Sequence, residues 1–202
     1  MNHQVNIIIA GADMGGLIAS CALHETGIVE VPSNSIDFHI LRLEKDTLTR
    51  EDVEECNLSG IQYAVNATLH DTEASLAFDE KCKEVGITVV HAVNLGKAAF
   101  LAVEKPKGYP FFEIMKRNIN ETSAFRRNLG KYISLYGKFW QKPVPWIDEA
   151  VLSRQGNGAW IAAGYCVNIL QNLAEGREVK YFPKFYLSPL LEELQRVVFP
   201  FF

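Results

Sequence analysis

The chain has 202 residues, 48% of them hydrophobic, and a formal net charge of −4, which predicts one globular core with a small appendage. It contains no run of about 18 apolar residues and no signal-peptide pattern, so we expect neither a membrane span nor secretion. The four cysteines form no C-x-x-C pair. This spacing argues against a zinc site and predicts reduced thiols in the cytoplasm.

The first half of the chain alternates between strand and helix patterns. Strand patterns occur at residues 5–10, 36–43, 61–68, 87–93 and 98–103. Helix patterns lie between them, at residues 15–25, from the capping pair Thr49 and Asp52 onward, and at residues 71–85. This alternation predicts an α/β fold, a Rossmann-like three-layer sandwich with a mostly parallel sheet.

The second half has a different pattern. A breaker-rich connector leads into residues 105–142, where nine Lys and Arg stand against two Glu, an excess of +7 that leaves −11 for the rest of the chain. This basic segment is either a solvated helix face or a surface for an acidic partner, a nucleic acid or an anionic ligand. Further patterns predict a helix over residues 159–173, a strand over 181–187 and a helical end over 190–202. We expect a nucleotide-binding core at 1–103, a basic helical insertion at 104–150 and a core-completing segment at 151–202.

A glycine turn follows the first predicted strand. Its residues are Gly11, Ala12, Asp13, Gly15 and Gly16. Glycines permit a sharp turn and the close approach of a phosphate, which a helix N-terminus attracts. Asp13 stands where the G-x-G-x-x-G fingerprint has its second glycine, and a carboxylate there would repel phosphates. The sequence therefore predicts the fold more strongly than it predicts a bound nucleotide.

A few other side chains are candidates for chemistry. Glu44, after the second strand, is either a ribose-binding acid or a surface acid. Lys97, near a strand end, is the best basic candidate to meet a ligand anion. His39 and His91 lie in strand patterns, and we expect both to be packed and hydrogen-bonded. Cys82 lies on an apolar helix face and is a predicted core residue.

One stretch resembles the ThiF/MoeB/HesA superfamily, the bacterial relatives of ubiquitin-activating enzymes. A strand runs into Asn66-Ala67-Thr68, similar to the Asp-Ala-Thr-Asp-Asn of that family. A helix with a near-central Cys82 follows, and then Gly86 and a short strand. The order of glycine turn, strands and helices fits across residues 5–103. The alternative is another Rossmann-like fold whose strand has a similar sequence.

The resemblance implies a chemistry that this chain matches only in part. It implies that ATP and Mg²⁺ are used to adenylate the C-terminal carboxylate of a ubiquitin-like carrier protein. The family's metal-binding aspartate and its arginine fall at Leu69 and Ala74, which cannot replace them. The resemblance leaves the following roles: phosphate contacts for Gly11, Ala12, Gly15 and Gly16, ribose contacts for Glu44 or Asp46, Mg²⁺ binding for Asp71, and a rescuing cation from Arg126.

These departures predict a reduced member of the superfamily whose ATP-dependent adenylation is weak or lost. Relatives dimerise through the Rossmann domain, so the resemblance implies a homodimer. A different hypothesis is a non-catalytic interaction subunit that presents residues 105–142 to a protein partner. An NAD(P)-binding oxidoreductase is disfavoured because no Tyr-x-x-x-Lys or catalytic His arrangement stands out. We expect no membrane or nucleic-acid partner.

Overall fold

The computed structural model describes residues 3–27, 36–43, 48–68, 72–96, 98–111, 122–135 and 157–189. Six strands form one sheet in the order β2-β1-β3-β4-β5-β6. Their bounds are β1 His3–Ala10, β2 Ile36–Leu43, β3 Tyr63–Asn66, β4 Thr88–Asn94, β5 Ala98–Glu104 and β6 Tyr186–Pro189. Strands β1 to β4 are parallel, whereas β5 pairs antiparallel with both β4 and β6. The predicted mostly parallel α/β sandwich is confirmed.

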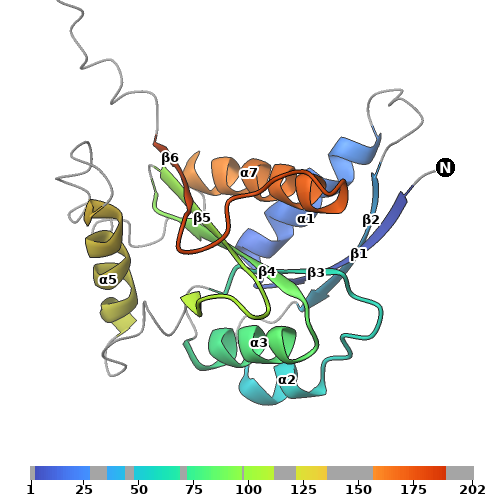
Figure 1. The fold of residues 1–202 in the computed structure, drawn as a ribbon, viewed down its shortest axis with the longest axis horizontal. Helices are drawn as coiled ribbons and strands as arrows, with labels where there is room; N and C mark the ends of the chain where they lie inside the picture. Colours follow the sequence, from blue (N-terminus) through green and yellow to red (C-terminus); the bar gives the residue numbers. More distant parts are fainter. Residues whose placement is uncertain are drawn as a thin grey trace, which may run out of the picture.

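Helices cover both faces of this sheet (Figure 1). Their bounds are α1 Asp13–Gly27, α2 Arg50–Glu55, α3 Thr72–Glu84, α5 Thr122–Leu135 and α7 Asn157–Ala174. Helices α1 and α7 pack together on one face, and α2 and α3 lie on the other. In β1, Ile7 and Ile9 join the core beneath α1 and α7, whereas Ile8 joins the core beneath α3. Because side chains alternate along a strand, an apolar run such as β1 is buried on both faces.

The short helix α2 is stabilised at both ends. At its start, the Thr49 hydroxyl accepts a hydrogen bond from the Asp52 amide, and the Asp52 carboxylate accepts one from the Thr49 amide. This is the capping box that the sequence predicted. At its end, Lys81 Nζ donates to the carbonyl oxygens of Val53, Glu54 and Cys56. A cation there complements the negative end of the helix dipole.

The remaining elements follow the sequence with several corrections. Helix α1 begins at Asp13, two residues earlier than predicted, and the late strand is confined to 186–189 because residues 182–184 form a turn at Pro183. The prediction for His39 is wrong: its side chain is 57% exposed on the edge strand β2, 3.7 Å from Asp37. The predicted helical end at 190–202 lies outside the described residues.

The basic segment contributes α5, which packs beside β5 (Figure 1). Leu129 and Ile133 of α5 are buried in a core with Phe100 and Phe111. Cys82 is buried beneath the sheet, as predicted, and burial raises the pKa of its thiol. None of the helices in the described ranges has the length and hydropathy needed to cross a membrane.

Candidate functional site

The glycine turn lies at the carboxyl end of β1, between two neighbouring strands. After β1 the chain crosses to β2 on one side, and β3 lies on the other side, so this is the point where the strand order reverses. Open α/β sheets bind ligands at such a point. Gly11 has a φ of 119°, and a Cβ atom there would lie 2.7 Å from the Ala67 carbonyl oxygen. The turn therefore requires glycine for its conformation and for its contact with the end of β3.

The other two glycines of the turn make room for protein atoms. A Cβ atom on Gly15 would lie 3.1 Å from Ile9 Cγ2, so Gly15 lets α1 pack closely on β1. A Cβ atom on Gly16 would lie 3.1 Å from Nη2 of Arg42, whose guanidinium reaches over from β2. The same Nη2 atom donates a 3.0 Å hydrogen bond to the Ala12 carbonyl oxygen. The guanidinium of Arg42 thus places a positive charge at the turn. The sequence analysis did not identify this residue, although it stands near the carboxyl end of a predicted strand.

Asp13 is the first residue of α1, and its side chain is exposed. A carboxylate in the first turn stabilises a helix through the helix dipole. The same position is where the N–H groups of a helix attract a phosphate. A phosphate bound there would be repelled by Asp13 and attracted by Arg42.

The structure brings together one part of the predicted site. Gly11 and Ala12 form the turn, and Asp13, Gly15 and Gly16 lie in the first turn of α1 directly after it. The other predicted positions, Glu44, Asp46, Asp71 and Lys97, lie outside the described residues, and so does the side chain of Arg126. Ala74, at the family's arginine position, is completely buried beneath the sheet. A longer side chain at this position would have to displace that core.

A second polar group, which the sequence analysis did not find as a site, is buried between α3 and the ends of β4 and β5. Its centre is Glu104, whose side chain is 1% exposed. The Glu104 carboxylate accepts hydrogen bonds from Lys83 Nζ at 2.5 Å, His91 Nε2 at 3.1 Å and the Phe111 amide at 3.0 Å. Burial alone would raise the pKa of Glu104, but the hydrogen bond and charge of His91, together with Lys83 and the Phe111 amide, lower it below its ordinary value. Glu104 is therefore ionised.

Asp79 of α3 faces the other edge of the same imidazole. Its Oδ1 atom accepts a 2.8 Å hydrogen bond from Asn66 Nδ2, while its Oδ2 atom lies 3.8 Å from His91 Nδ1. Burial raises the pKa of Asp79 to about 7, although His91 and the Asn66 hydrogen bond oppose the rise. His91 is buried and hydrogen-bonded, so that sequence prediction is confirmed.

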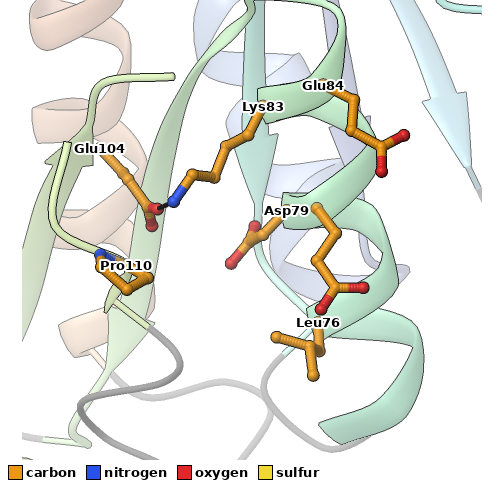
Figure 2. A pocket seen from close by; sticks show the side chains of 7 residues that line it. Leu76, Asp79, Lys83, Glu84, Glu104 and Pro110 are labelled. Carbon is orange, nitrogen blue, oxygen red and sulfur yellow. Dashed lines mark hydrogen bonds and ion pairs between the residues drawn. The ribbon is translucent and has the colours of Figure 1, made fainter. Parts of the chain in front are cut away.

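A pocket of about 220 Å³ opens beside this group (Figure 2). Its lining residues come from α3 and from the end of β5 with the loop after it: Leu76, Asp79, Glu80, Lys83, Glu84, Glu104 and Pro110. Figure 2 shows Lys83 reaching across to Glu104, with the Asp79 carboxylate directed into the space below them. The residues of the group are spread over 26 positions, from 79 to 104, and share no motif spacing, so only the fold brings them together.

The structure is similar in fold to two solved proteins. E. coli MccB, in a structure with AMPCPP and MccA, matches with a TM-score of 0.51 and 12% identity over 92% of this chain and 64% of MccB. PaaA matches with a TM-score of 0.53 and 13% identity over 92% of this chain and 69% of PaaA. The likeness is one of fold. With 64% of MccB covered, this chain spans less than two thirds of the length of that protein, which is a microcin C7 biosynthetic enzyme.

Both likenesses support the α/β fold that the sequence predicted. The sequence itself matches no protein-family model and no curated protein.

Proposed function

We propose that this chain is a reduced relative of the ThiF/MoeB/HesA adenylating enzymes that binds ATP at its glycine turn, with carrier adenylation weak or lost. The position of the turn carries the proposal: Gly11 ends β1 at the reversal of strand order, where α1 presents its N-terminus. Phosphates bind at such helix starts because of the unpaired N–H groups and the helix dipole. The fold neighbour MccB has been solved with the ATP analogue AMPCPP, which supports the same class of ligand here.

In this proposal, Arg42 supplies the positive charge for the nucleotide phosphates. Its guanidinium already lies against Gly16 and the Ala12 carbonyl, at the start of α1. Arginine binds phosphate oxygens through two parallel hydrogen bonds, which makes it stronger than a point charge. Glu44 or Asp46 would contact the ribose and Lys97 a ligand anion. Asp71, with Mg²⁺, and Arg126 would serve any adenylation that remains.

Calorimetric titration of the full chain with ATP and AMP, with and without Mg²⁺, tests the proposal. We expect saturable ATP binding that Arg42→Gln weakens by about tenfold or more, since a charged hydrogen bond contributes about 1.5–3 kcal/mol. Arg50→Gln is the matched control. It removes the same charge from α2, where Arg50 is exposed and paired with Glu54 at 2.7 Å, and should leave binding unchanged. Absence of ATP binding at millimolar concentration, or equal effects of the two variants, would contradict the proposal.

The same titration can show that the turn binds a nucleotide other than ATP. An arginine after the second strand of a Rossmann unit can hold the 2′-phosphate of NADP. NAD and NADP are therefore titrated beside ATP. If the chain prefers NADP to ATP and Arg42→Gln abolishes that preference, the result would support an NADP-binding oxidoreductase and contradict the ATP-binding proposal.

A protein-interaction role is favoured by the outer face of α7. Trp160 and Tyr165 are 62% and 44% exposed there, and large aromatic side chains are enriched at protein interfaces. MccB has been solved with MccA, so a fold neighbour also binds a partner. In this second proposal the partner is another copy of the chain. Sedimentation of the wild type as a dimer, and of Trp160→Ser as a monomer, would support it, whereas a wild-type monomer would contradict it.

A further inference from the structure

The buried group of Asp79, His91 and Glu104 takes no part in the proposed nucleotide site. We propose that Asp79 and His91 bind a divalent metal ion of the zinc class, with Glu104 orienting the imidazole. One ligand atom from each of the three side chains can be chosen so that all lie within 4.8 Å of one another. The site uses a nitrogen and an oxygen ligand, so the absence of cysteine pairs from the sequence does not bear on it.

Glu104 fixes which nitrogen of His91 can reach the metal. An ionised carboxylate only accepts hydrogen bonds, so the 3.1 Å contact places the imidazole hydrogen on Nε2. In the neutral imidazole, which is the form that binds a metal, the lone pair is then on Nδ1, the nitrogen on the Asp79 side. Phe111 holds the ring from its face, with ring centroids 4.4 Å apart. Metal-binding histidines commonly donate their other N–H to a carboxylate in this way, which orients the ring and increases its basicity.

The Oδ2 atom of Asp79 faces His91 Nδ1 at 3.8 Å. The Asp79 side chain is 5% exposed, and Oδ2 accepts no hydrogen bond from the part of the chain that the structure describes. A buried carboxylate oxygen without a donor is costly, because burial removes its water. Asp79 lines the pocket, so an ion entering from the pocket can approach its carboxylate.

The gap between the two ligand atoms fits a metal ion better than it fits a hydrogen bond. Nδ1 and Oδ2 are 3.8 Å apart, beyond hydrogen-bond distance. Zinc lies about 2.0–2.1 Å from a histidine nitrogen and about 2.0–2.2 Å from a carboxylate oxygen. An ion at those distances makes an angle of about 130° with the two atoms, and a closure of roughly 0.4 Å gives tetrahedral geometry. Water in the pocket completes the coordination.

The charge of the pocket favours a dication over a proton. Four carboxylates, those of Asp79, Glu80, Glu84 and Glu104, line it with one ammonium group, that of Lys83. Lys83 is paired with Glu104 at 2.5 Å, so its single charge is shared between Glu104 and the nearby Asp79. A metal ion brings two positive charges next to Asp79, whereas protonation of His91 brings one.

Metal titration of the full chain tests the proposal. Protein freed of metal with a chelator is titrated with Co²⁺, followed by visible absorption, and with Zn²⁺ in competition with a chromophoric chelator. We expect one ion per chain, with affinity at least about tenfold lower in Asp79→Asn, since loss of even a supporting residue costs about 10–100-fold. Glu84→Gln is the matched control, because it removes the same charge from the same helix and pocket without removing a ligand. Its affinity should change less than about threefold.

A second measurement needs no variant, and so does not depend on how Asp79→Asn folds. In wild-type protein labelled with nitrogen-15, Zn²⁺ should shift the Nδ1 resonance of His91 while Nε2 keeps its hydrogen. Absence of Co²⁺ and Zn²⁺ binding at millimolar concentration, equal effects of the two substitutions, or an unshifted His91 Nδ1 would overturn the proposal. Asp79 and His91 would then be a pair that shares a proton.

Discussion

Replacement of Gly11 by alanine tests how the glycine turn is built. The Gly11 φ of 119° is strained for any residue with a side chain, at a cost of about 1–3 kcal/mol. The added Cβ atom would also lie 2.7 Å from the Ala67 carbonyl oxygen and 2.9 Å from its carbon, both backbone atoms that cannot move alone. Forcing an atom into such a space costs about 1–3 kcal/mol more. We therefore expect Gly11→Ala to lower the free energy of unfolding by roughly 2–6 kcal/mol.

Gly86→Ala is the control for this substitution. Gly86 has a φ of 82°, and a Cβ atom there would meet nothing within 4 Å, so this variant carries only the backbone cost of about 1–2 kcal/mol. Urea denaturation followed by circular dichroism measures both variants. The difference between them isolates the contact with Ala67. Equal losses of stability in the two variants would refute the close packing of the turn on β3.

Three further predictions concern the two polar sites. Asp13→Gly removes a carboxylate from the start of α1, and ATP should bind at least about tenfold more tightly by calorimetry, because like-charge repulsion there is of the order of 1–3 kcal/mol. Unchanged binding would place that carboxylate outside the phosphate site. Carboxylate-dependent exchange of pyrophosphate into ATP should stay near background, because Leu69 and Ala74 replace charged groups that stabilise the transition state. Robust exchange with a carrier protein would contradict this. In metal-free protein, the pKa of Asp79 near 7, against an ordinary 3.8, means that the folded state holds this proton more tightly. The resulting stability is complete below about pH 4 and is lost as the pH rises to about 7, by roughly 4 kcal/mol, so urea melts of Asp79→Asn should show a weaker pH dependence across this range than wild type.

Most strands of the sheet could be predicted from the sequence because apolar runs, and the glycines, prolines and capping residues between them, are local signals. The capping box of Thr49 and Asp52 involves residues three positions apart. Gly11 and Gly86, both with positive φ, follow the carboxyl ends of β1 and α3. His39 was assigned wrongly because a strand pattern does not say which strand lies at the edge of the sheet. Strand order is set by long-range pairing, which a local pattern cannot predict.

The polar sites were harder to predict for the same reason. Arg42 reaches the glycine turn from 26 positions beyond Gly16, and no spacing rule connects the two residues. Asp79, His91 and Glu104 stand on three different elements. His91 and Glu104 lie in apolar strands, which favours a core role, and Asp79 lies beside the charged residues Glu80 and Lys81 of α3, which favours a solvated role. These residues meet because α3 packs on the face of the sheet formed by β3 and β4, beside the end of β5. A single sequence shows the polar residues but not this packing.

The Asn66-Ala67-Thr68 motif explains why the resemblance to adenylating enzymes predicts the fold better than the activity. Asn66 donates to the Ser75 carbonyl and to Asp79, so it ties the end of β3 to α3. The Asn66 side-chain oxygen also accepts hydrogen bonds from Thr68, which close the turn between these two elements. Ala67 contacts Gly11 through its backbone and leaves no space for a larger residue in the glycine turn. Each residue of the motif is therefore required by packing or by a buried hydrogen bond, whether or not a carboxylate is adenylated nearby. A chain can keep these contacts while Leu69 and Ala74 stand where the resemblance places catalytic charges. We therefore expect this chain to retain the Rossmann-like sheet and to adenylate weakly or not at all.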